Sequence, residues 1–393
     1  MKTHIKKHLL FIFSLCLIIN QTMVSYGGGS EFALPENGGV HPMFQLREEE
    51  EKIKLSDNLI EWDEIDKIIR DYNPEVRNAW NGYQTNQNNS DINEHYMDMA
   101  DRFDALANSA ASDAQEAMFQ AQSYAMQINA DNNVSDSLTQ YYSCIQLEKM
   151  TILNTRTYFI NYYKNQLAHE IAVLTEEEAE RELKSAENKY SLGSITKVDA
   201  LNAKVNYFSK QSNTILALSN LNQTKQNLLI SVGKDYKNPD VIIGIFPMID
   251  FNIVTLTNPE MDKINAVDNN LQFKTYQRNL NNAQTAAVIS KYQLLVDDAP
   301  SYIKSDIDTK FRAVKDSMNS LMLSQQKSMA SNDDFSKIAS QYKLGSVSKR
   351  EYKTAEFKKQ VAQKEAQIAY YDFAIIYYTY LAAVDGLASA SAN

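Results

Sequence analysis

Glycine, proline and cysteine are scarce in this chain of 393 residues, and their scarcity narrows the possible folds. Eleven glycines and seven prolines, beside many Asn, Gln, Lys, Glu, Ala and Ser residues, favour extended helix over sheet. The two cysteines, Cys16 and Cys144, give no disulfide framework, and we expect Cys144 to be a buried small hydrophobe. Because 44% of the residues are hydrophobic, the chain can still form a core. We therefore expect an all-α protein of long helices.

The apolar run at the N-terminus, residues 9–19, is too short to span a bilayer. It follows three lysines within the first seven residues, and the residues at 25–27 offer a cleavage site with small side chains. This combination is typical of a secretory leader, so we expect residues 1–27 to be removed from an exported protein.

Basic residues are also fewer than acidic ones, 39 against 49. The formal net charge of −10 becomes −13 once the leader is removed, because the leader contains three lysines and no acidic residue. A chain of this sign lacks the basic stripe that releases counterions from phosphates. Nucleic-acid binding is therefore not expected.

The most informative feature present is a segment that occurs twice, 152 residues apart. The first copy, YSLGSITKVD, begins at Tyr190, and the second, YKLGSVSKRE, begins at Tyr342. In each copy a leucine precedes a glycine, Gly193 or Gly345. Glycine ends helices in this way because it adopts the left-handed conformation without a Cβ penalty.

A new helix is predicted to begin directly after each glycine. Thr196 with Asp199, and Ser348 with Glu351, have the spacing of a capping box. In that motif a hydroxyl and a carboxylate three residues apart each accept the other residue's backbone N–H. We therefore interpret each copy as the tip of a hairpin of two long helices.

Apolar spacing predicts the helices before the first tip. Helix is expected to begin near Trp62, and a coiled-coil seam then continues to Ile128. The members of this seam are Tyr96, Met99, Phe103 and Leu106. Residues 129–136 are predicted to form a turn, and the longest helix of the chain is expected from about Ser137 to Leu192.

Beyond the first tip, spaced apolar residues predict a return helix that ends at Gly233. Its seam consists of Val198, Leu201, Val205, Phe208 and Ile215. Residues 240–256 form the one credible extended segment. The second half begins near Met261, is expected to turn over 297–300, and passes through the second tip to end at Gly386.

These boundaries divide the chain into six parts. They are a leader (1–27), a linker (28–56), a first helical-hairpin repeat (57–239), a connector (240–260), a second repeat (261–386) and a tail (387–393). Both repeats therefore follow one plan of helix, glycine turn, helix and closing glycine.

Two tandem copies of this plan resemble the TolC family of outer-membrane efflux proteins over nearly all of the chain after the leader. The motifs NPE at 73–75 and NNL at 269–271 lie where that family begins its repeats, and Gly233 and Gly386 lie where it closes them. The resemblance implies a homotrimer whose twelve helices form a hollow cylinder. It also implies that the tips form an aperture facing an adaptor and an inner-membrane pump.

The chain departs from the family between the ascending and descending helices of each repeat. The family inserts two membrane strands there, and each such strand needs about 9 to 11 residues of alternating polarity. Residues 129–136 and 297–300 leave room only for turns and do not alternate. We therefore expect a helical cylinder that lacks both outer-membrane β-hairpins, as would suit a cell envelope without an outer membrane.

The resemblance assigns adaptor contact and the lining of the aperture to the two tips. The candidate residues are Tyr190, Leu192, Gly193, Ser194, Lys197, Asp199, Tyr342, Leu344, Gly345, Ser346, Lys349 and Glu351. Capping alone is sufficient to explain Asp199 and Glu351, and the turn explains both glycines. Lys197 and Lys349 recur without a structural need, so they are the better candidates for partner contact, against the alternative of solvated lysines.

Other patterns have ordinary structural explanations. The aromatic run over 370–380 contains Asp372 and tyrosine hydroxyls, so packing between helices explains it better than a membrane segment. The acidic residues and histidine over 94–101 have metal-like spacing, but a solvated helix face explains them. The sequence contains no phosphate loop, nucleophile elbow or zinc motif, so we predict no catalytic, cofactor-binding or metal site.

The leading hypothesis is a non-enzymatic export conduit in the cell envelope. It would work with a membrane-fusion-type adaptor and, indirectly, an ATP-driven ABC transporter. The alternative is a coiled-coil scaffold that keeps the duplicated hairpins and conducts nothing, and an enzyme ranks third. Neighbouring genes for an adaptor and an ABC transporter would favour the conduit.

Overall fold

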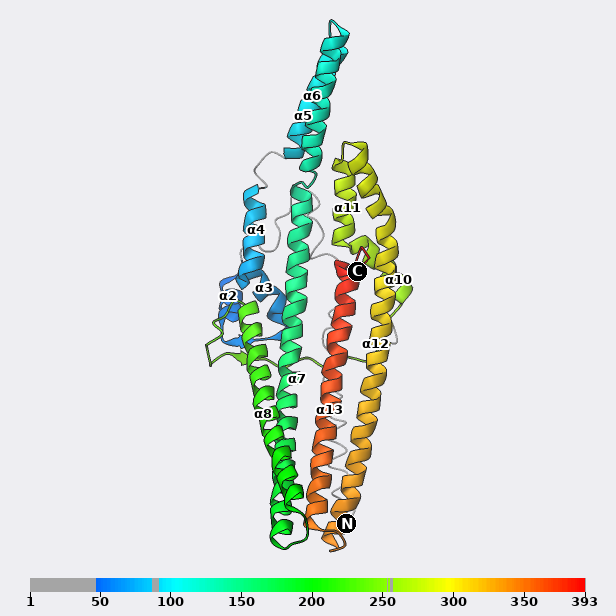
Figure 1. The fold of residues 1–393 in the computed structure, drawn as a ribbon. Helices are drawn as coiled ribbons and strands as arrows, with labels where there is room; N and C mark the ends of the chain where they lie inside the picture. The colour runs from blue at the N-terminus through cyan, green and yellow to red at the C-terminus, as the bar shows by residue number, and fades with distance from the viewer. Residues whose placement is uncertain (1–46, 87–91, 253, 255–256, 393) are drawn as a thin grey trace.

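A computed structural model describes residues 47–86, 92–252, 254 and 257–392, and the predicted leader lies outside these residues. Four long helices dominate it, and the all-α prediction is confirmed (Figure 1). They are α7 (Ser137–Ser191), α8 (Lys197–Ser231), α12 (Ala286–Lys343) and α13 (Lys349–Ala382). The four lie side by side in one layer, in the order α8, α7, α13, α12. Helix α7, with 55 residues, was predicted to be the longest, but α12 is longer, with 58 residues.

Shorter helices complete the upper half of the layer. Helix α4 (Pro74–Asn86) packs on α7, α11 (Leu271–Asn282) packs on α7 and α12, and α10 (Pro259–Asn269) packs on α12. In Figure 1, α4 stands above α8 and α11 stands above α13. The two longest helices, α7 and α12, are thus accompanied by pairs of shorter helices placed end to end, α8 with α4 and α13 with α11.

A small unit beside the layer joins the start of the described chain to the connector. It contains α2 (Glu49–Ser56), the 3₁₀ helix η3 (Trp62–Glu64) and α3 (Ile65–Tyr72). Strand β1 (Leu59–Ile60) pairs in parallel with β2 (Ile242–Ile243). The predicted linker therefore ends in a helix, anchored by the buried Leu55, and the extended segment contributes two strand residues whose partner β1 was not predicted.

In the first repeat, α8 ends and α4 begins beside a glycine. Gly233 has a φ of +70°, and a Cβ there would overlap the carbonyl oxygen of Tyr72 at the end of α3. Beside it, Asn73 Nδ2 donates to the carbonyl oxygen of Ser231, the last residue of α8, at 2.8 Å. The Oδ1 atom of Asn73 accepts two N–H groups of the first turn of α4, each at 3.0 Å. One asparagine therefore closes one helix and caps the next.

The second repeat uses the same device. Gly386 has a φ of +106°, and a Cβ there would lie 2.5 Å from the carbonyl oxygen of Asn269. Asn270 Nδ2 donates to the carbonyl oxygen of Ala388, and its Oδ1 accepts the N–H of Phe273, both at 2.8 Å. The predicted starts and closing glycines of the two repeats thus meet in space as equivalent junctions.

The core lies at mid-height and is aromatic. The Trp62 ring lies 5.4 Å from that of Phe159, 4.8 Å from that of Phe246 and 4.9 Å from that of Tyr378. The predicted aromatic run over 370–380 packs into this core along α13. No described helix combines the length and the apolar content needed to cross a membrane.

Two polar features lie within this core. Arg70 Nε donates to Glu148 at 2.9 Å, and Trp80 Nε1 donates to the same carboxylate at 2.8 Å. Charge-assisted bonds of this kind offset the cost of burying the carboxylate. Cys144 is buried as expected, and burial raises the pKa of its thiol to about 11, so the thiolate that reacts is scarce at neutral pH.

The predicted seam that ran on to Ile128 is interrupted by a turn. Helices α5 (Ile92–Asn108) and α6 (Asp113–Asn132) form an antiparallel hairpin that extends beyond the top of the layer (Figure 1). Residues 109–112 are serine and alanine, so no glycine or proline marks the reversal. Its one local signal is Ser112, whose hydroxyl accepts the N–H of Gln115 and caps α6.

The turn predicted over 297–300 is wrong. Pro300 lies inside α12, and the chain reverses at 283–285 instead. The neighbouring Ile303 and Ile307 are fully buried, so packing offsets the hydrogen bond that proline removes. Asp131 of the first repeat caps α12 by accepting the N–H groups of the two residues before it, at 2.7 and 2.9 Å. That cap is 153 residues away in sequence, so local patterns do not reveal it.

Glycine substitutions test the junction. Gly233→Ala should lower the free energy of unfolding by about 2 kcal/mol or more, because it adds a clash with Tyr72 to the cost of a left-handed conformation. Gly193→Ala, where a Cβ meets nothing within 4 Å, should cost about 1 kcal/mol. Gly82→Ala in α4 should stabilise by about 0.5 to 1 kcal/mol. Denaturant unfolding followed by circular dichroism measures all three, and equal losses for Gly233→Ala and Gly193→Ala would contradict a role for the close approach.

Candidate functional site

Both tips are built on the same backbone turn at the lower end of the layer. Gly193 has a φ of +72° and donates its N–H to the carbonyl of Tyr190 at 2.9 Å, while Ser194 donates to the carbonyl of Lys189 at 2.8 Å. Gly345 has a φ of +74°, and the equivalent bonds of the second tip measure 3.0 and 2.9 Å. This pair of bonds is the Schellman motif, so the glycine turns predicted from sequence are present in both copies.

The caps that follow the turns differ between the copies. Thr196 Oγ1 accepts the N–H of Asp199 at 3.2 Å, and Asp199 Oδ2 accepts the N–H of Thr196 at 3.0 Å, which is a complete capping box. The Thr196 hydroxyl also donates to Asp199 Oδ2 at 2.8 Å, and this bond, together with that from the Thr196 N–H, holds the pKa of Asp199 below its usual value. In the second tip Ser348 Oγ accepts the N–H of Glu351 at 3.2 Å, but in the described structure the Glu351 carboxylate returns no such bond. Capping thus explains the Asp199 carboxylate and does not explain that of Glu351.

The side chains at the tips point into solvent. Leu192 and Leu344 occupy the same place in the two copies and are 80% and 81% exposed. Lys197 and Lys349 are exposed as well. Each tip therefore presents an apolar residue and a cation a few residues apart, on a backbone held by its own hydrogen bonds.

Arg350 and Tyr352 of the second tip make contacts that were not predicted from the sequence. Arg350 Nη1 donates to Ser185 Oγ of α7 at 2.8 Å, so this tip is tied to the neighbouring hairpin. The rings of Tyr342 and Tyr352 stack with centroids 4.8 Å apart. The equivalent positions of the first tip hold valine and alanine. The signal that could have found them is therefore the difference between the copies.

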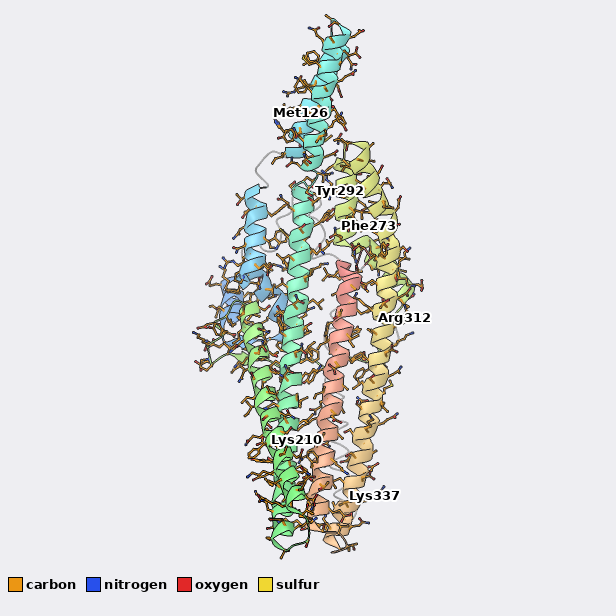
Figure 2. The ribbon with its side chains drawn as sticks, in the orientation of Figure 1. Met126, Lys210, Phe273, Tyr292, Arg312 and Lys337 are labelled. Carbon is orange, nitrogen blue, oxygen red and sulfur yellow. The ribbon has the colours of Figure 1, made fainter. Side chains whose placement is uncertain are left out.

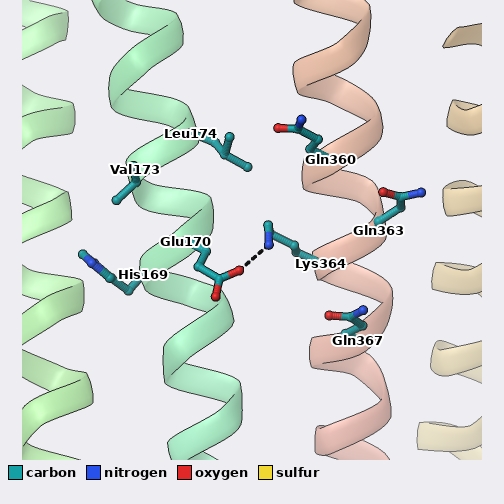
Figure 3. A pocket seen from close by; sticks show the side chains of 8 residues that line it. All are labelled: His169, Glu170, Val173, Leu174, Gln360, Gln363, Lys364 and Gln367. Atoms are coloured by element: carbon teal, nitrogen blue, oxygen red, sulfur yellow. Dashed lines mark hydrogen bonds and ion pairs between the residues drawn. The ribbon is translucent and has the colours of Figure 1, made fainter.

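Above the tips, α7 and α13 are joined by polar side chains. Thr354 Oγ1 donates to Glu178 at 2.9 Å, and Lys364 pairs with Glu170 further up. An open groove of about 590 Å³ lies between the two helices at this level, and Figure 3 shows Lys364 reaching across it to Glu170. Polar contacts of this kind exchange with water more readily than buried apolar contacts. The lower ends of the two hairpins are therefore held together less firmly than the middle.

The two edges of the layer, α8 and α12, expose large apolar side chains. On α8 they are Val198, Leu201, Val205, Phe208, Ile215, Leu216, Leu218 and Ile230. On α12 they are Ile289, Leu294, Tyr302, Met322, Leu323 and Met329. Figure 2 shows side chains projecting from both edges, where Lys210 and Lys337 are labelled. The seam predicted for α8 thus faces away from the core of the protomer.

Within the described residues, no cluster of three or more metal-ligating side chains is present. The acidic residues and histidine over 94–101 are exposed on α5, which matches their interpretation as a solvated face. The candidate site therefore consists of the tips and the two edges.

No family model and no curated protein sequence matches this chain, but solved structures do. The outer-membrane channel OprN aligns with 83% of this chain and 90% of its own, at a TM-score of 0.53 and 11% identity. A membrane protein from Pseudomonas aeruginosa aligns over 82% and 92%, at 0.53 and 9%. CusC, solved in work on its folding and transmembrane channel formation, aligns over 83% and 92%, at 0.52 and 9%. OprN and CusC are TolC-family channels, and the chain has a TolC-like fold.

The contact between the second tip and α7 can be tested by substitution. Arg350→Ala removes an exposed hydrogen bond, so it should change the free energy of unfolding by less than about 1 kcal/mol. Amide hydrogen exchange over residues 340–352 should nevertheless become faster. Lys349→Ala, which removes the same charge from the next residue, serves as the control. Equal exchange rates in the two variants would show that Arg350 does not hold the tip.

Proposed function

We propose that three copies of this TolC-like chain close into an α-helical tube in the cell envelope and that the tube is an export conduit. The observation that carries the proposal is the layer itself, which is one helix thick and apolar at both edges. Contact between α8 of one copy and α12 of the next joins different surfaces, and such head-to-tail contacts form a closed ring when the rotation between copies closes.

The exposed apolar residues supply a driving force for this assembly. Complete burial of one large apolar side chain contributes about 1.5 to 3 kcal/mol. Association costs an estimated 4 to 15 kcal/mol in lost freedom of motion. The free energy gained by burying the eight partly exposed residues of α8 against α12 is comparable with that cost, whereas a monomer would leave them in contact with water.

The tips are the proposed contact with a membrane-fusion-type adaptor. A trimer would present six tips, each with an exposed leucine and lysine, so weak single contacts would act together. The sequence contains no phosphate-binding loop, so the energy for transport would come from an ATP-driven transporter behind the adaptor. A scaffold would share the trimer but would not need adaptor contact or support export.

Assembly is tested at the edge of the layer. Phe208→Glu with Ile215→Glu should convert a trimer into a folded monomer, because four-helix layers cannot pair across two buried charges. The control is Asn206→Glu with Asn213→Glu, which adds the same charge to exposed polar positions on the other side of α8. Native mass spectrometry and light scattering give the subunit number. A stable monomer of the unmodified chain at micromolar concentration would contradict the tube.

Adaptor contact is tested at the lysines. A photo-crosslinking residue at position 192, introduced in the native host, should capture a protein with an adaptor's paired-helix hairpin. Lys197→Glu with Lys349→Glu should then weaken binding of that adaptor and reduce its salt dependence. Lys210→Glu with Lys337→Glu, above the tips in Figure 2, is the control. Unchanged affinity and salt response in the tip variant would exclude the lysines, and normal export by cells lacking the chain would favour a scaffold.

A further inference from the structure

The α5–α6 hairpin has no role in the proposed tube. It extends along the long axis beyond α7 and α11, at the end of the molecule opposite the tips (Figure 1). The first repeat takes 120 residues from Asn73 to Gly193, and the second takes 75 from Asn270 to Gly345. The hairpin accounts for nearly all of this difference, so it is an addition to one repeat only.

The hairpin is attached firmly to the second repeat. Asp131, near the end of α6, accepts the N–H groups of Gln284 and Thr285 directly before α12. Asn93 Nδ2 donates to the carbonyl oxygen of Ala130 within the hairpin at 2.7 Å, and it lies 3.5 Å from the carbonyl oxygen of Asn282 in the second repeat. Because these bonds involve backbone groups of both repeats, the direction of the hairpin is set by the layer below it.

The contact between α5 and α6 buries mainly small side chains. The most buried residues of the hairpin are Asn93, Ala100, Ala107, Ser123 and Ala130. The bulky apolar side chains are at most half-buried, and Ile92, Leu106, Met118, Tyr124 and Ile128 are exposed. Small side chains remove little apolar area from water, so the contact alone stabilises two helices of 17 and 20 residues weakly.

Charge indicates what covers the exposed side chains. On α5 the apolar positions 96, 99, 103 and 106 form one face, and the acidic positions 94, 98 and 101 lie on the opposite face. Helices that pack through the apolar face keep these carboxylates in water. Copies of the hairpin can therefore pack together without bringing their acidic faces into contact.

We propose that the three α5–α6 hairpins of the trimer pack on one another as a six-helix bundle beyond the upper end of the tube, an inference that rests on the proposed trimer. The partner surface is a second copy of this chain. The apolar edge of α12 supports this choice, because its exposed residues Ile289 and Leu294 lie just below the hairpin's attachment. The edge that meets the next copy thus continues into the hairpin. The bundle forms a trimer contact separate from that of α8 with α12.

The test uses the full chain and a charge-matched pair of variants. Leu106→Glu with Tyr124→Glu places charges on the exposed apolar residues, and Asn108→Glu with Gln122→Glu adds the same charge at exposed polar positions of the same helices. Native mass spectrometry reports the trimer, and hydrogen exchange over residues 92–132 reports the bundle. In the trimer, Leu106→Glu with Tyr124→Glu should speed exchange over 92–132 by about tenfold or more, with α7 and α12 unchanged and the control like the unmodified chain.

The outcomes separate this inference from the proposed function. A trimer whose hairpin exchanges rapidly in the unmodified chain, or whose exchange is the same in both variants, would overturn the bundle and leave the tube intact. Absence of a trimer in the unmodified chain would overturn both the bundle and the tube. Slow exchange that is lost only in the Leu106→Glu, Tyr124→Glu trimer would support the bundle.

Discussion

The architecture depends on two glycine junctions. At each junction one helix ends so close to the backbone of another segment that no side chain fits between them. Gly233 lies against the backbone of Tyr72, and Gly386 lies against that of Asn269. At the first junction Asn73 bonds the last carbonyl of α8 and caps α4, and at the second Asn270 bonds the carbonyl of Ala388 and caps α11. Helix α7 is about 80 Å long with its 55 residues, whereas its neighbours α8 and α13 have 35 and 34 residues. The layer is continuous from top to bottom only because α4 stands directly on α8 and α11 stands on α13.

The free energy of this layer is concentrated at mid-height. Aromatic rings gather there around Trp62, and the buried Arg70–Glu148 pair lies in the same region. Towards the tips, α7 and α13 meet through polar side chains such as Ser185 and Arg350. Apolar burial resists separation of helices, whereas exposed polar bonds exchange with water at little net cost. The lower ends are therefore held together less firmly than the middle of the layer.

Features encoded by neighbouring residues could be predicted from the sequence. Gly193 and Gly345, with the threonine or serine after each, specify a helix end and a helix start within ten residues. Features that depend on distant contacts could not, because those contacts compete with local signals. Pro300 is typical of a turn, but α12 continues through it because the neighbouring Ile303 and Ile307 are buried. The reversal at 109–112 was missed because alanine and serine are compatible with helix as well as with a turn.

The sequence by itself determined the helical content, the two tips and the closing glycines, because each follows from backbone preferences and hydrogen bonds between residues a few positions apart. Tertiary structure alone decided where the second repeat reverses, since Asp131 caps α12 from 153 residues away. It also decided that the seam of Phe208 and Ile215 faces outward. Periodicity shows that a helix has an apolar face, but the number of neighbouring helices in the layer determines whether that face is covered within one chain.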